Sequence, residues 1–151
     1  MTLHLLSTAI KRHLKETKAL LEQVREVNLS THSGTDGRTI LQIWLHMLRS
    51  YEFYLRGLVT NVWEPLPYSE EQYSVASELI GLFDQVNKTC LEYLDHLTEE
   101  DLSRRAELIH GSASKEELLL EMLEHAVQHR GQILVLYRIS GVIPAKIEYL
   151  V

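Results

Sequence analysis

Residues 114–140 have the sequence SKEELLLEMLEHAVQHRGQILVLYRIS, and their apolar side chains recur at helical spacing. The segment begins with a capping box, Ser114-Lys115-Glu116-Glu117, in which a serine and a glutamate three residues apart cap the first turn. A serine and a glycine follow at its end, and a proline lies three residues further on. The sequence therefore predicts an amphipathic helix from residue 114 to about residue 139.

Two histidines lie on the apolar face of this predicted helix. His125 and His129 are four residues apart, so both project from the same side. The other residues within about 80° of His125 on the helix are mostly apolar and include Leu118, Met122, Ile133 and Leu136. Both imidazole rings are therefore predicted to point into the core, where their nitrogens need partners.

Three other segments repeat apolar residues at intervals of three and four. They are residues 3–28, residues 38 or 39 to about 60, and a segment that begins with the capping box Ser69-Glu70-Glu71-Gln72 and continues to Leu97. Between the third and fourth helices we expect a short capped turn and then an irregular stretch, with a turn at His110-Gly111. No segment of strand length alternates cleanly between apolar and polar residues. Four helices with connecting loops predict a four-helix bundle.

The composition fits this fold and restricts the partners. The chain has 151 residues, 45% hydrophobic and 24% charged, which is typical of one soluble globular domain. Only 3 prolines and 7 glycines argue against an all-β fold. The net charge of −6 and the lack of a basic tract argue against binding to nucleic acid or to an anionic membrane.

The same composition bears on localisation. No apolar run approaches the roughly 18 residues of a membrane span, and the N-terminal pattern does not match a secretory signal peptide. The single cysteine, Cys90, cannot form an intrachain disulfide and lies in an apolar-periodic segment, so we expect an inert, packed thiol. A cytoplasmic location is therefore expected.

A third histidine, His46, lies at the centre of the apolar face of the second predicted helix, which also carries Gly57. This glycine either lets a neighbouring helix approach closely or marks a frayed helix end. Burying a histidine without partners costs about 1–3 kcal/mol, and a divalent metal removes this cost by taking one nitrogen from each ring. The pattern predicts a metal site formed by His46, His125 and His129, with coordination positions left open, as in catalytic sites.

The surroundings of these histidines leave several roles open. A di-iron site is disfavoured, because Met122 occupies the position three before the second histidine, where such sites need a carboxylate. Glu121 either accepts a hydrogen bond from an imidazole or lies at the rim. Gln132 either bonds a bound species or satisfies a buried polar group. Arg130 points away from the histidines and is expected to pair with a carboxylate on a neighbouring helix or to act at an interface, and His13 lies beside the apolar stripe of the first helix.

The second predicted helix contains one histidine, residues 125–132 read His-x-x-x-His-Arg-Gly-Gln, and Gly-Val-Ile-Pro with an apolar tail follows. This combination resembles the DinB family of DinB/YfiT-like metalloenzymes. The resemblance covers the whole chain. It implies one domain, residues 1–151, folded as an all-α four-helix bundle of the up-up-down-down style, with a short C-terminal tail packed on it. It also implies a homodimer and a divalent ion, zinc or nickel before iron or manganese, bound by His46, His125 and His129.

Characterised members of the family include thiol transferases that use bacillithiol and isomerases that use mycothiol or glutathione. We therefore expect a metal-dependent enzyme that transfers a low-molecular-weight thiol to a small electrophile, with no side chain identified as a general base. Two alternatives are a metal-dependent hydrolase and a non-enzymatic, metal-stabilised bundle induced by stress or DNA damage. The sequence identifies neither the substrate nor the native metal, since imidazole ligands suit several divalent ions.

Overall fold

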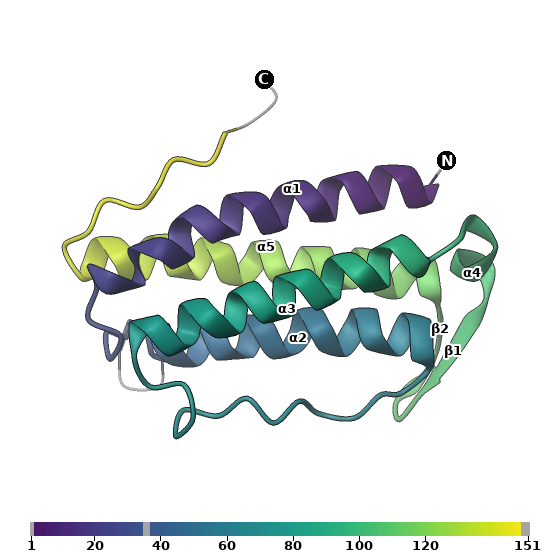
Figure 1. Ribbon diagram of the computed structural model, residues 1–151, viewed down its shortest axis with the longest axis horizontal. Coiled ribbons are helices and arrows are strands. Elements are labelled where there is room, and N and C mark those ends of the chain that lie inside the picture. Colours follow the sequence, from purple (N-terminus) through teal and green to yellow (C-terminus); the bar gives the residue numbers. More distant parts are fainter. Residues whose placement is uncertain (1, 35–36, 149–151) are drawn as a thin grey trace.

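Four long helices form the molecule, in a computed structural model that describes residues 2–34 and 37–148. They are α1 (Thr2–Glu22), α2 (Ile40–Thr60), α3 (Ala76–His96) and α5 (Lys115–Ile139). The helices lie side by side as a bundle, and α2 packs against both α3 and α5 (Figure 1). The predicted all-α four-helix bundle is confirmed.

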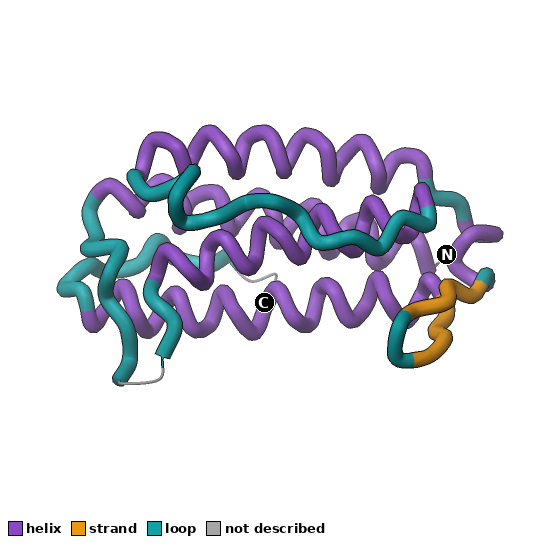
Figure 2. Tube along the Cα trace, turned by 90° about the horizontal axis from the view of Figure 1, so that it is seen from below, coloured by secondary structure: helices purple, strands orange, loops and turns teal. Residues whose placement is uncertain are grey.

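Parallel neighbours and one long crossover define the connectivity. The helices α1 and α5 run in one direction, and α2 and α3 run in the other (Figure 1). The crossover, residues 61–75, runs back along the bundle to join α2 to α3 (Figure 2). The helix directions therefore follow the order up, down, down, up. The up-up-down-down order that the family resemblance implied is wrong for this chain, because its long crossover joins the second and third long helices rather than the first and second.

Capping boxes begin α2 and α5 at the predicted positions. The side chain of Thr39 accepts a hydrogen bond from the backbone N–H of Gln42, and the Gln42 side chain accepts one from the N–H of Thr39. Ser114 and Glu117 make the same reciprocal pair at the start of α5. These side chains satisfy backbone donors that the first turn of a helix leaves unpaired, which is why the two helix starts could be predicted.

Two other predicted boundaries are wrong. The first helix ends at Glu22 and continues only as a short 3-10 turn, Gln23–Arg25, because the Gln23 side chain bonds the backbone of the C-terminal segment at residues 143 and 145. The third helix begins at Ala76 rather than near Ser69. The carboxylate of Glu78 accepts hydrogen bonds from the N–H groups of residues 74 and 75. The N-cap residue of α3 is therefore Val75 and not Ser69.

The stretch predicted to be irregular contains a β-hairpin. After the short helix α4 (Glu99–Ser103), strands β1 (Arg105–Leu108) and β2 (Gly111–Ser114) pair antiparallel. The predicted turn is where the hairpin reverses, and Gly111 has a φ of 137°, which favours glycine. The strands are too short, and β2 too polar, for periodicity to reveal them.

The core and the C-terminal segment agree with the prediction. The indole N–H of the buried Trp44 donates to the hydroxyl of Tyr137, which donates to the carbonyl of Leu20, so one chain of bonds links α2, α5 and α1. Cys90 is fully buried, and burial raises the pKa of its thiol. Pro144 is buried against the bundle, as expected for the tail, whose residues 149–151 lie outside the described residues. No described helix is long and apolar enough to span a membrane.

Candidate metal centre

Three histidine rings from two helices meet between α2 and α5. The Nε2 atom of His125 lies 3.0 Å from the Nε2 atom of His46 and 3.0 Å from that of His129. The ring centroids are 4.4 to 4.9 Å apart, and the ring planes are nearly perpendicular to one another. The antiparallel packing of the two helices therefore brings together the side chains whose convergence the spacing predicted.

The geometry of this histidine cluster, His46, His125 and His129, fits a metal ion. Imidazole nitrogens about 2.0–2.1 Å from a tetrahedral ion lie about 3.3 Å from one another, close to the spacing found here. One candidate ligand atom from each ring lies within 4.8 Å of the others. The cluster could therefore hold a divalent metal ion, and three imidazoles do not select one metal among zinc, nickel, copper and iron.

Gln132 fixes the orientation of one of these rings. Its Oε1 atom lies 2.7 Å from Nδ1 of His129. Because the amide oxygen can only accept, Nδ1 of the ring donates, and the neutral ring then carries a lone pair on Nε2, which faces the cluster. Of the two roles predicted for Gln132, the structure shows the bond to a buried polar group.

Burial and the charge of Arg38 lower the pKa values of two rings of the cluster, His46 and His125. Burial lowers the pKa of His46 to about 4, and the guanidinium of Arg38 is the next largest cause. Burial also lowers the pKa of His125, followed by the effects of His129 and Arg38, while Glu121 acts in the opposite direction. At neutral pH these rings are therefore unprotonated, which is the form that binds metals.

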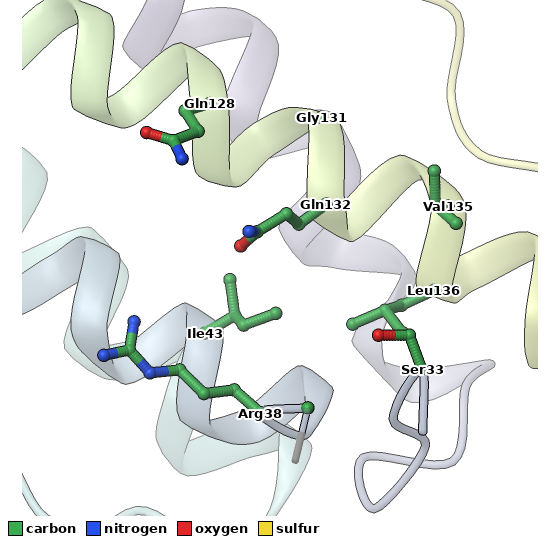
Figure 3. A pocket seen from close by; sticks show the side chains of 9 residues that line it. Ser33, Arg38, Ile43, Gln128, Gly131, Gln132, Val135 and Leu136 are labelled. Atoms are coloured by element: carbon green, nitrogen blue, oxygen red, sulfur yellow. The ribbon is translucent and has the colours of Figure 1, made fainter. Parts of the chain in front are cut away.

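Two cavities flank the histidine cluster along the seam between α2 and α5. The first, which we call the arginine cavity, has a volume of about 600 Å³ and is lined by Arg38, Ile43, Gln128, Gly131 and Gln132, among others (Figure 3). The second, the tryptophan cavity, has about 480 Å³ and is lined by side chains of α2 and α5, by Trp63 of the crossover and by the β-hairpin. The cluster therefore lies between two spaces of small-molecule size.

Comparison with known proteins shows the family of this chain. The model of the DinB family matches residues 1–151. The chain belongs to the DinB family. Over 132 residues it is 25% identical to the uncharacterized protein YjoA of Bacillus subtilis, a match that covers 85% of this chain and 84% of YjoA.

Solved structures similar to this DinB-family protein support the fold. The crystal structure of YjoA superposes with a TM-score of 0.78 at 19% identity, and that of a DinB-like protein from Bacillus cereus with 0.76 at 18%. Each superposition covers 95% of both chains.

Glu121 and Arg130 of the DinB-family chain lie near the cluster without joining it. The Oε1 atom of Glu121 accepts a hydrogen bond of 3.0 Å from the hydroxyl of Tyr54, and among the described residues no histidine bonds this carboxylate. Of its two predicted roles, the structure therefore supports the rim position. Arg130 Nη1 lies 2.8 Å from the carboxylate of Glu16 on α1, so the predicted pairing with a neighbouring helix is confirmed.

His13 lies in a separate polar site inside the bundle. Its Nε2 atom is 2.9 Å from the hydroxyl of Tyr51 and 3.2 Å from that of Thr17. The side chain is buried, and this burial, followed by the charge of Arg130, lowers its pKa to about 3. His13 therefore has hydroxyl partners of its own and does not contribute to the histidine cluster.

Three features of this region were not predicted from the sequence. Arg38 was expected only at a helix start, and no function was expected of Trp63 or of a bond between Tyr54 and Glu121. No local signal could place Trp63, because the crossover is positioned by tertiary packing alone.

Proposed function

We propose that this DinB-family protein is a metal-dependent thiol transferase. In this proposal His46, His125 and His129 bind a divalent ion, with zinc or nickel as first candidates, and the protein joins a low-molecular-weight thiol to a small electrophile. The observation that carries the proposal is the position of the cluster: three imidazoles converge on α2 and α5 between two cavities of small-molecule size.

The chemistry needs few other side chains. When bound, the ion supplies a Lewis acid that favours the thiolate form of a thiol at neutral pH. The sulfur lone pair forms a bond to the electrophilic carbon while the bond from that carbon to its leaving group breaks. The leaving group departs with the bonding electrons, and the thiol proton passes to solvent. No general base is required, which agrees with the absence of an assigned base among the candidate site residues.

The residues of the chain prepare the reactants. Gln132 holds His129 in the tautomer that presents Nε2 to the cluster. The charge of Arg38, close enough to lower the pKa of His46, also favours an anionic sulfur near the rings. The Phe53 and Trp63 side chains of the tryptophan cavity offer the electrophile an apolar surface.

Two measurements on untagged protein test this function. Elemental analysis after loading with zinc or nickel is expected to find about one ion per chain in the wild type and in His96→Ala, and little in His125→Ala. The control histidine lies exposed at the end of α3. Retention of the metal by His125→Ala would contradict the proposed site.

The second measurement follows the reaction itself. The loaded protein is mixed with glutathione, cysteine or mercaptoethanol and with monobromobimane, which becomes fluorescent when a thiolate displaces its bromide. We expect metal-dependent acceleration with at least one thiol. Acceleration of ester cleavage without any thiol would instead support a hydrolase, and no metal-dependent rate in either assay would favour a non-enzymatic bundle.

A further inference from the structure

The two cavities beside the histidine cluster have opposite chemical character. Arg38 lies in the arginine cavity and makes no hydrogen bond or ion pair among the residues that the structure describes. Its guanidinium and the amides of Gln128 and Gln132 surround the same space between the two helices (Figure 3). Arg38 is exposed, so its guanidinium and the two amides offer hydrogen-bond donors to an anion that enters the cavity, above all to a carboxylate.

The tryptophan cavity has a built apolar wall. The Trp63 ring packs at 5.5 Å from the ring of Phe53, and it lies directly on Gly57. A Cβ atom at position 57 would lie 2.4 Å from two atoms of the indole, a distance that no side chain tolerates. Both roles predicted for Gly57, a close helix contact and a frayed helix end, are therefore wrong. The glycine leaves room for the Trp63 ring, which forms a wall of the cavity.

The only carboxylate that lines the tryptophan cavity within the described chain belongs to Glu121. It lies where this cavity approaches the cluster, one helical turn before His125, and it is bonded to the hydroxyl of Tyr54. Burial, followed by the bond to this carboxylate, raises the pKa of Tyr54 to about 12, so the phenol keeps its proton. A negatively charged group would be repelled at this end and attracted at the end of Arg38.

The sequence positions place the cavities on opposite sides of the cluster. On α2, Ile43 of the arginine cavity precedes His46, and Phe53 of the tryptophan cavity follows it. On α5, which runs the other way, Gln132 follows His129, whereas Glu121 precedes it. Both helices therefore present the order arginine cavity, histidine cluster, tryptophan cavity.

We propose that the two reactants divide between these cavities: the thiol binds with a carboxylate on Arg38, and the electrophile is an uncharged compound whose aromatic or branched aliphatic group occupies the tryptophan cavity. The inference rests on the proposed function, since it assigns the substrates of that site. Sulfur and electrophilic carbon then meet at the histidine cluster. The bond changes are those given above, with the leaving group departing with its electron pair and the thiol proton going to solvent.

The thiol half is tested on protein loaded with cobalt(II), in which sulfur binding gives a charge-transfer band. Mercaptopropionate and mercaptoethanol differ in the carboxylate, so they form a matched pair. We expect Arg38→Gln to weaken mercaptopropionate about tenfold or more and to leave mercaptoethanol unchanged, the loss expected of one charge-assisted hydrogen bond. Arg138→Gln is the control, because the side chain of this exposed arginine bonds, among the described residues, only the Leu134 carbonyl of its own helix.

The electrophile half is tested on the metal-free protein through the fluorescence of Trp63. Methyl benzoate is expected to change the emission in a saturable way, and benzoate is expected to bind at least about tenfold more weakly. The variant Trp63→Phe gives the background from the buried Trp44. Gly57→Ala should weaken methyl benzoate about tenfold by displacing the indole, whereas Gly131→Ala, whose Cβ meets no atom within 4 Å, should not. Phe53→Ala removes part of the same wall and serves if Gly57→Ala does not fold.

The outcomes separate this inference from the proposed function. A cobalt band that appears with thiols but does not depend on Arg38 or on the carboxylate would overturn the inference and leave the thiol transferase in place. Equal binding of benzoate and its ester would also overturn it. The absence of a band with every thiol would contradict the proposed function itself, and the fluorescence arm would still test the apolar cavity.

Discussion

The bundle contains two histidine environments that differ in their partners. His13 shares hydrogen bonds with the hydroxyls of Tyr51 and Thr17, inside a packed site of α1 and α2. The rings of the histidine cluster instead face one another, Nε2 to Nε2, and lie between two cavities along α2 and α5. A hydroxyl can donate or accept as a histidine requires, whereas neutral imidazole nitrogens that face one another need a proton or a cation between them.

The nearest polar atoms distinguish a structural histidine from a candidate metal ligand. Burial lowers the pKa of both His13 and His46, so neither burial nor pKa separates them. The separation comes from the nearest polar atoms: hydroxyls in one site, other imidazoles in the other. Variants near His13 are expected to have the largest effects, and variants near the histidine cluster have smaller ones.

The largest effect is expected at Arg130, whose ion pair with Glu16 lies beside His13. Both side chains are mostly buried, at 11% and 15% exposure. Arg130→Met leaves the carboxylate without its partner and should lower the free energy of unfolding by about 3 kcal/mol, measured by urea denaturation.

The double variant Arg130→Met with Glu16→Leu is the control. Removing both charges should restore most of the loss, because apolar side chains of similar volume replace a buried pair at little cost. A double variant that is as unstable as the sum of the two single variants would show that the pair is not the cause.

A smaller effect is expected from the titration of His13. The folded state holds the pKa of His13 at about 3, against the ordinary value of 6.5 for a histidine. Below pH 6.5 the unfolded chain binds a proton that the folded chain does not, so stability falls as the pH decreases toward 3. Between pH 7 and pH 5 this one group should remove about 2 kcal/mol.

The measurement is urea denaturation of metal-free wild type and of His13→Gln at both pH values. The glutamine can bond Tyr51 but does not titrate, so its stability should fall less over this range. The histidine cluster contributes equally to both proteins and cancels in the difference. Identical pH dependence in the two proteins would contradict the assigned shift.

Gln132 offers a test of the open site. Gln132→Ala removes the acceptor that orients His129, so the affinity for zinc should fall about tenfold, measured by competition with a chelating dye. Gln128→Ala is the matched control on the same helix and cavity, and it should bind zinc within a factor of about two of the wild type. A larger loss for Gln128→Ala than for Gln132→Ala would contradict this assignment.

The smallest effect is expected at Gly131, which lies inside α5 beside the arginine cavity. Since a Cβ atom there meets nothing within 4 Å, Gly131→Ala should stabilise the protein by about 0.5–1 kcal/mol through helix propensity. Thermal unfolding should show a rise of a few degrees. A decrease in stability would mean that the space beside the cluster is not open.

The sequence could predict the parts of the fold that local chemistry determines. Reciprocal caps at Thr39 and Ser114 begin α2 and α5 where expected. The phase of His46 on its helix, relative to the pair on α5, was sufficient to predict that the three rings meet. The start of α3 could not be predicted, because Ser69 can cap a helix that begins after it and Glu78 can cap one that begins at Ala76. Tertiary packing decides between these two starts.

The surroundings of the site could not be predicted for the same reason. Arg38 follows a loop, and nothing local states that its guanidinium extends along the seam. Trp63 reaches its place only because the crossover folds back on α2 and because Gly57 leaves room for the ring. Periodicity therefore located the candidate ligands, and tertiary packing determined the chemistry on either side of them.

The long crossover has a consequence for how such proteins can diverge. It is anchored to α2, where Arg49 bonds the carbonyl of Tyr68 and the hydroxyl of Tyr68 bonds Glu52, so it is a fixed part of the molecule rather than a loose linker. Yet it carries no histidine of the cluster. A graft of residues 61–75 together with the β-hairpin onto another bundle of this kind would thus replace part of the lining of the tryptophan cavity while the three imidazoles stay as they are. In this architecture the lining of a cavity can evolve independently of the candidate metal ligands.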